Sequence, residues 1–444
     1  MTSQERVRPM GKRLLFIALT IAFGAFAGAF AWAFFFLMNQ GIHLLWDVVP
    51  SWLAQAGLPA LFYPIAFCTA GGLVIGLFAK RFGPYPDDMN TVMAKVKATG
   101  RYDYDTLGPS FFGALLPLLF GGSIGPEAGL TGVIAGLCTW VGDRLRFVGS
   151  EMRELAEAGT AAVISAIFAT PLFGLAVPIV GAADESGGTR SIREVRLGVG
   201  KPLKVAIYVL AVAGALGMMG LLGSLFGASG GLPRFTQIAC GLPELLWALP
   251  LIAVGTLAGW LFFPFGMLAK KVAEALGKHI IVKPIIAGAL LGVSGVLLPY
   301  TMFAGEAQTE QLAESWMGIS ATILILTGFC KVLTTQVCLN LGWRGGHFFP
   351  IIFAGISIGY GMATLTGIDP TFALCAVTAS LVGTVMRQPV MTMVLLFLVF
   401  PLAGAPVLLI AASIGSVIPV PGRSAHTEQT APTPEDPTPE TDEA

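Results

Sequence analysis

Charge is what this sequence has least of. Only 12 % of its 444 residues are charged and the formal net charge is zero, whereas soluble proteins carry roughly 25 % charged residues. The low charge excludes an ordinary soluble domain, and the neutral balance gives no sign of nucleic-acid binding. Hydrophobic residues make up 55 % of the chain and its mean hydropathy is +0.77. The composition therefore indicates a polytopic membrane protein.

Cysteine and histidine are also scarce. The six cysteines lie scattered in apolar stretches without a CxxC pair, and the four histidines show no spacing typical of metal ligands. The cysteines are best interpreted as small buried hydrophobic residues. We expect neither a metal nor another cofactor.

The N-terminus combines basic residues with a long apolar run. Arg6, Arg8, Lys12 and Arg13 precede the run Leu14–Met38. That run is long enough to span a bilayer and longer than the hydrophobic region of a signal peptide. The positive-inside rule then predicts a cytoplasmic N-terminus, and we expect a bacterial inner membrane.

Apolar runs divide the rest of the chain. We predict a cytoplasmic segment 1–13, a first transmembrane repeat 14–226, a connecting segment 227–243, a second repeat 244–420 and a disordered acidic tail 421–444, which is rich in Pro and Thr. The run 108–120 is too short to cross alone, so it predicts a partial helix buried in protein.

Two glycine-rich stretches have the same character. Residues 121–127 read GGSIGPE and residues 345–350 read GGHFFP; each starts a new apolar run. Glycine permits a sharp turn, and proline suits the first turn of a helix. Each stretch therefore predicts a helix N-terminus inside the membrane region, which attracts an anion through its free N–H groups and its dipole.

Proline also interrupts an apolar run in each half. Residues 167–172 read IFATPL and residues 385–390 read VMRQPV. Such breaks are tolerated where the freed backbone lines a cavity or is buried in protein. The pattern predicts an all-α membrane protein of two related, inverted repeats, whose tilted and partly broken helices surround a midplane site.

Four of these segments resemble motifs of the CLC family of chloride channels and chloride/proton antiporters. Residues 122–127 (GSIGPE) look like the family's Gly-Lys/Arg-Glu-Gly-Pro, and residues 346–350 (GHFFP) are similar to its Gly-x-Phe-x-Pro. Residues 170–174 (TPLFG) and 387–390 (RQPV) look like its two proline-led segments. The resemblance covers about 14–420 and is strongest to a divergent bacterial branch whose first motif ends in Gly-Pro-Glu.

The resemblance implies a homodimer in the lipid membrane with one anion pore in each subunit. Chloride or a similar small anion is the expected substrate. The motifs Ser123–Gly125 and Gly346–Phe348 supply the expected anion site. Within it, the backbone N–H groups of Ile124, Gly125, His347 and Phe348 are expected to face the anion.

The sequence departs from the family pattern in four places. Ile124 stands at the family's gating glutamate, and about Gly181 stands at its inner proton-transfer glutamate. Residues 83–84 contain no counterpart of the pore serine, and residues 422–426 contain no counterpart of the pore tyrosine. Both expected proton carriers are therefore absent.

Three residues of the first motif have two interpretations each. Ile124 is either a packed apolar side chain or a hydrophobic constriction of the pore. Glu127 either caps a helix N-terminus or acts as a displaced gate or proton carrier, since an ionisable residue at this depth is a functional candidate. Ser123 offers its hydroxyl either to the anion or to a helix cap.

The second half supplies four further candidates. The His347 imidazole is either a bystander or a pH sensor, and Phe348 either belongs to the core or lines the pore. Arg344 either adds positive potential at a vestibule or anchors an interface. Arg387, at a helix break, needs a partner or a vestibule, and we favour the vestibule.

These observations favour passive anion permeation, most simply of chloride and without proton coupling. The alternative is a proton-coupled anion antiporter that uses Glu127 and carries chloride or another anion. An enzyme is the third class, because GGSIG fits the G-x-S-x-G nucleophile elbow around Ser123. That elbow requires a preceding strand and a histidine base, and an apolar helix is expected here instead. We therefore expect no enzymatic activity.

Overall fold

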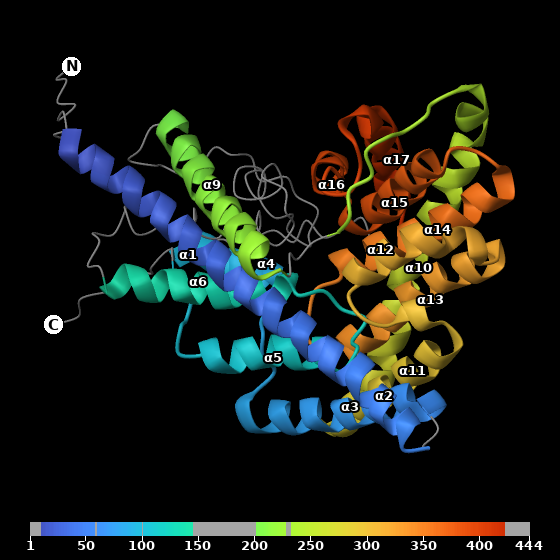
Figure 1. Ribbon diagram of the computed structural model, residues 1–444, viewed down its shortest axis with the longest axis horizontal. Helices are drawn as coiled ribbons and strands as arrows, with labels where there is room; N and C mark the ends of the chain where they lie inside the picture. The colour runs from blue at the N-terminus through green and yellow to red at the C-terminus, as the bar shows by residue number, and fades with distance from the viewer. Residues whose placement is uncertain (1–9, 58–59, 100, 145–200, 228–231, 422–444) are drawn as a thin grey trace, which may run out of the picture.

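The computed structural model describes residues 10–57, 60–99, 101–144, 201–227 and 232–421 (Figure 1). Their regular structure is helical. The first half contains α1 (Met10–His43), α2 (Val49–Gln55), α3 (Tyr63–Phe82), α4 (Met89–Thr99), α5 (Leu107–Leu119), α6 (Glu127–Arg144) and α9 (Lys201–Phe226). The second half contains α10 (Leu242–Ala275), α11 (Val282–Leu297), α12 (Glu306–Ser315), α13 (Ala321–Asn340), α14 (Phe348–Thr366), α15 (Pro370–Met386), α16 (Pro389–Leu396) and α17 (Ala405–Val417).

The helices have the lengths and composition of a multi-pass membrane protein. Six spans in the described ranges are long and apolar enough to cross a bilayer: Thr20–Gln55, Tyr63–Phe82, Val209–Phe226, Leu242–Ala275, Ala321–Asn340 and Phe348–Thr366. Shorter apolar helices, such as α5, lie between them. The predicted all-α membrane fold is therefore confirmed.

The broken helices of the second half lie where the sequence predicted them. α15 ends at Met386 and α16 begins at Pro389, and Arg387 between them has a positive φ of 56°. A segment without regular structure, 232–241, precedes α10 within the predicted connection. The first proline break, at 167–172, lies outside the described residues, as do 1–9 and 422–444. The division into two repeats stays a prediction.

Small residues set how closely the helices approach. Gly24 and Gly28 of α1 lie directly against the backbone of Ala211 and Ala215 in α9, so a Cβ on either glycine would overlap it. The two helices consequently run side by side (Figure 1). In a bilayer the hydrophobic effect contributes little to helix association. Close van der Waals packing of this kind therefore holds the two helices together.

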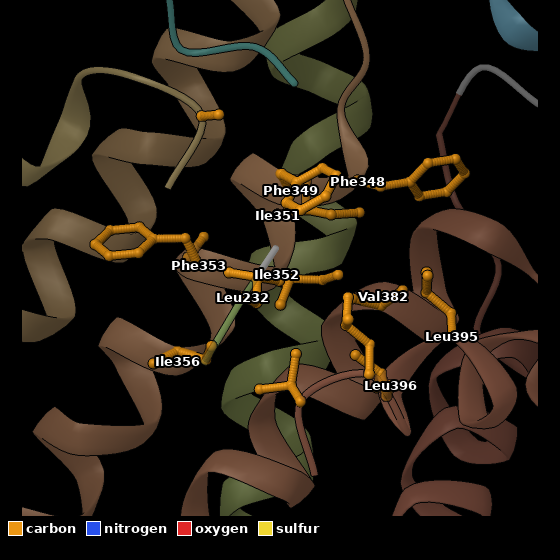
Figure 2. Packing of buried hydrophobic residues seen from close by; sticks show 14 of the residues in the cluster. Leu232, Phe348, Phe349, Ile351, Ile352, Phe353, Ile356, Val382, Leu395 and Leu396 are labelled. Atoms are coloured by element: carbon orange, nitrogen blue, oxygen red, sulfur yellow. The ribbon is translucent and has the colours of Figure 1, made fainter. Parts of the chain in front are cut away.

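The helix α14 is the centre of the core. Its span is 83 % buried, and it packs between α13 and α15. Figure 2 shows Phe348 and Phe353 pointing to opposite sides of this helix, among buried side chains such as Ile352 and Val382. The N-terminus of α14 is therefore surrounded by protein rather than by lipid.

Candidate anion site

Glycine serves the two motifs in different ways. Gly121 ends α5 with a positive φ of 83°, and Gly122 donates its N–H to the Pro117 carbonyl at 2.8 Å. In the second motif the positive φ belongs to Gly342, at 98°, and not to the glycine pair. Gly345 and Gly346 instead leave space for the side chains of the first motif, because a Cβ on either glycine would overlap Ile124 or Glu127.

The two motifs meet in an isolated antiparallel bridge. The Gly125 N–H donates to the Gly346 carbonyl at 2.8 Å, and the Gly346 N–H donates to the Gly125 carbonyl at 2.8 Å. α6 begins at Glu127 and α14 at Phe348, two residues beyond each half of the bridge. The bridge therefore brings the N-termini of both helices to one place.

Glu127 reaches across this junction. Its side chain is 1 % exposed, and Oε1 accepts a hydrogen bond from the Phe348 N–H at 2.8 Å. Oε2 has no hydrogen-bond partner among the described residues. A Cβ on Gly125 or Gly346 would overlap the carboxylate. Glu127 thus places a negative group at the N-terminus of α14, where a small anion would be bound.

The structure gives different positions to the other main-chain candidates. The Phe348 N–H faces the carboxylate of Glu127, but the Gly125 N–H is engaged in the bridge and does not point into the site as expected. Ile124 is fully buried, and its side chain lies against Gly345. The ring of His347 is half-buried, with its centroid 4.6 Å from that of Phe348.

Ser123 belongs to a cluster of hydroxyl groups. Its Oγ lies 3.1 Å from Thr335 Oγ1 and accepts a hydrogen bond from Thr334 Oγ1 at 3.2 Å. Both threonines lie on α13 and are buried. Ser123 is therefore hydrogen-bonded to a neighbouring helix, and the described residues show no serine–histidine pair with His347.

Lys331 of α13 is a buried charge that the sequence analysis did not single out. It is fully buried, and its Nζ donates to the carbonyls of Thr301, Met302 and Phe303. The sequence feature that indicates it is a lysine inside the apolar run 319–337, because ionisable residues are rare in membrane-spanning segments.

Arg344 and Arg387 lie in different surroundings. Arg344 is exposed and lines a cavity of about 220 Å³ together with Lys283, Tyr85 and Asn340. Arg387 does not line this cavity; its guanidinium donates to the Ile418 carbonyl at 2.7 Å. The described structure thus places Arg344 at a basic cavity and gives Arg387 a backbone partner.

The turn between α3 and α4 carries an acidic pair. Asp88 caps α4 by accepting the Thr91 N–H at 2.9 Å. Asp87 accepts hydrogen bonds from Lys95 Nζ at 2.6 Å and the Tyr102 hydroxyl at 3.0 Å. Burial favours the neutral acid, but these hydrogen bonds and the charges of Lys95 and Arg344 hold the pKa of Asp87 below its ordinary value.

Comparisons with known proteins agree with this architecture. The chain is 27 % identical over 331 residues to YfeO of Escherichia fergusonii, which carries the name of an ion-transport protein, and covers 71 % of each chain. It is 24 % identical over 446 residues to the chloride channel protein CLC-e of Arabidopsis thaliana, covering 87 % of this chain and 58 % of that one.

Solved structures share the fold. A CLC-type fluoride/proton antiporter matches with a TM-score of 0.67 at 19 % identity, over 93 % of this chain and 96 % of its own. A slow cyanobacterial Cl⁻/H⁺ antiporter matches with a TM-score of 0.71 at 18 % identity, over 90 % and 94 %. The family model described as voltage gated chloride channel matches residues 71–419, from α3 to the end of α17. The chain therefore belongs to the voltage gated chloride channel family.

Proposed function

We propose that this protein lets small anions, chloride first, cross the membrane passively at the junction of α6 and α14. The observation that carries the proposal is the carboxylate of Glu127 on the Phe348 N–H, 2.8 Å away. A carboxylate oxygen and a halide ion make the same demand on a protein, since both need N–H donors and positive potential. The site that holds one is suited to the other.

Glu127 acts in this proposal as a gate that the anion displaces. Its Oε1 occupies the N–H donor of Phe348, so an anion binds there only after the carboxylate has moved. Its Oε2 has no hydrogen bond to hold it among the described residues. Ile124, at the position of the family's gating glutamate, cannot compete with an anion or carry a proton. The gate is thus displaced by three residues along the chain.

Proton coupling is the second candidate, and one observation favours it. Glu127 is a titratable group that lies fully inside the protein at the anion site, as a proton carrier must. The two similar solved structures are antiporters, one of fluoride and one of chloride. In this alternative, Glu127 takes up a proton when the anion displaces it, and the substrate is chloride or another small anion.

The deciding experiment measures anion efflux from liposomes that contain the purified protein. External chloride and external pH are recorded together, with and without a potassium ionophore. Passive permeation predicts efflux that requires the ionophore and moves no protons against their gradient. Proton movement at a fixed ratio to chloride would instead establish the second candidate.

The variant Glu127→Gln tests the gate. Glutamine keeps the shape but loses the charge, and hydrogen bonds to charged groups are about twice as strong as neutral ones, so we expect efflux to rise about fivefold. Glu310→Gln, an exposed change on α12, is the matched control and should leave efflux unchanged. Loss of proton flux with anion flux kept supports coupling through Glu127, and unchanged behaviour contradicts both roles.

We also propose three properties for the molecule in the cell. The protein is a homodimer, its membrane is the inner membrane of a bacterium, and its N-terminus is cytoplasmic. The basic residues Arg6, Arg8, Lys12 and Arg13 support the orientation, because such residues are retained on the cytoplasmic side.

A further inference from the structure

Lys331 has hydrogen-bond partners that suit a charged ammonium group. Its Nζ donates to three carbonyl oxygens, at 3.2 Å for Thr301, 2.7 Å for Met302 and 2.6 Å for Phe303. A charged ammonium has three N–H donors, whereas a neutral amine has two. The three bonds use all three N–H donors of the ammonium. Because carbonyl groups carry no net charge, they do not neutralise its positive charge.

The contacts of Lys331 lead to both motifs of the anion site. Phe303, which accepts one of its hydrogen bonds, donates its own N–H to the Gly121 carbonyl at 2.9 Å. On the other side, Nζ lies 5.2 Å from the ring centroid of Phe353, in the second turn of α14. The ammonium therefore lies behind the first motif and beside the helix that begins at the second.

The hydroxyl cluster gives a third connection. Thr334 and Thr335 follow Lys331 on α13 by three and four residues, about one helical turn, and both are hydrogen-bonded to Ser123. The described residues show no salt bridge to Lys331 that would cancel its charge. Burial of a lysine in a membrane protein is costly, which favours a functional reason for its presence.

We propose that Lys331 is a positioning residue for the anion, whose positive charge raises anion affinity at the α6–α14 junction without touching the ion. The effect is electrostatic, since a charge in a low-dielectric interior acts over several ångströms. This inference rests on the proposed anion transport and adds to it the source of the attraction. The three carbonyl bonds keep the ammonium in position, so it attracts the anion but does not bind it.

The test compares variants of Lys331 by the chloride concentration that gives half-maximal efflux. Lys331→Gln keeps hydrogen-bond donors and loses the charge, and Lys331→Arg keeps the charge. We expect the half-saturating concentration to rise about tenfold in Lys331→Gln and to stay near the wild-type value in Lys331→Arg. Lys270→Gln, an exposed lysine on α10, is the matched control and should change nothing.

A second pair of variants keeps the test decisive if Lys331→Gln does not fold. Thr327→Asp places a counter-charge one turn before Lys331 on α13, on the other side of it from the threonines that bond Ser123, and Thr327→Asn is its neutral counterpart. We expect Thr327→Asp, and not Thr327→Asn, to weaken chloride affinity. Wild-type affinity in Lys331→Gln, or equal affinities in the two Thr327 variants, would show that Lys331 only supports the fold. Absence of any anion efflux from the wild-type protein would instead overturn the proposed function itself.

Discussion

Ile124 is the apolar side chain of the first motif whose two interpretations lead to different experiments. It is fully buried against Gly345, directly before the bridge residue Gly125. Both interpretations of the sequence, a packed side chain and a constriction, agree with this position. They differ in what happens to transport when the side chain is shortened.

We expect Ile124→Ala to raise anion efflux several-fold, because it removes bulk at the narrow junction of the motifs. The same change should lower stability by about 2–4 kcal/mol, as truncation of a buried isoleucine does. Efflux and the unfolding midpoint are measured on the same preparation. Ile124→Val, which removes one methyl group, is the control and should have a small effect on both. Lower stability with unchanged efflux would assign Ile124 to the packing alone.

At the residue scale, the sequence indicates Glu127 as a candidate but does not indicate its partner. Glu127 was identified because a carboxylate in apolar sequence is rare. Its contact with Phe348 joins residues 221 positions apart, which no local pattern contains. Lys331 carried the same signal as Glu127 and was overlooked, because no motif surrounds it. Ser123 was expected at an anion or a cap, and its bonds to α13 depend on helix packing.

Among the elements, the turn before α4 shows how charge fixes a short segment. Asp87 joins Lys95 of α4 to Tyr102 of the following loop, and its side chain is 28 % exposed. The hydrogen bonds favour the charged form in the folded protein, so the folded-state pKa is lower than that of the unfolded chain.

We expect Asp87→Asn to destabilise the protein by about 1–2 kcal/mol at neutral pH, because a charge-assisted pair becomes a neutral one. The stabilisation by Asp87 is present above the unfolded-state pKa and is lost as pH falls through the lower folded-state pKa. The difference between wild type and variant should therefore shrink in acid. Unfolding midpoints in detergent across acid and neutral pH measure it, with the exposed Asp105→Asn as control. A difference that does not depend on pH would contradict this account.

Local sequence predicted the short elements well. The short helix α5 and the break between α15 and α16 follow from run length and proline. The role of the second glycine pair was predicted incorrectly, since the turn is made by Gly342. Gly345 and Gly346 are small because Ile124 and Glu127 of the other motif lie against them. The spacing of residues along the chain does not show that a segment distant in sequence needs the space beside these two glycines.

At the scale of the whole molecule, one chain supplies all the residues of the junction between the two motifs. Gly125, Glu127, Gly346 and Phe348 all belong to one chain, so each subunit of a homodimer holds a complete junction. Large apolar side chains such as Ile410 and Val417 of α17 remain exposed in the single subunit and face either lipid or a second copy. The family and the membrane fold followed from composition and motif order, whereas the repeat division is still untested.

We expect labelled protein in membranes to bleach in two steps, as a homodimer does. A linked dimer of one wild-type and one Glu127→Gln subunit should give efflux midway between the two parent dimers, because the sites work independently. Linked dimers of two identical subunits are the controls. Single-step bleaching would exclude the homodimer, and efflux equal to that of either parent would show that the subunits are coupled.

The paired glycine bridge restricts how this protein can move. Two reciprocal hydrogen bonds join the starts of α6 and α14, and breaking both inside the protein costs about 1–3 kcal/mol for each group left unpaired. Separating the helices is therefore unfavourable, whereas turning the Glu127 carboxylate breaks one hydrogen bond, that from the Phe348 N–H, and leaves the bridge intact. In the proposed gate, opening is a rotamer change of Glu127, which is faster than the microsecond-to-millisecond rearrangement of domains. The rate of permeation should accordingly depend only weakly on the stiffness of the surrounding bilayer.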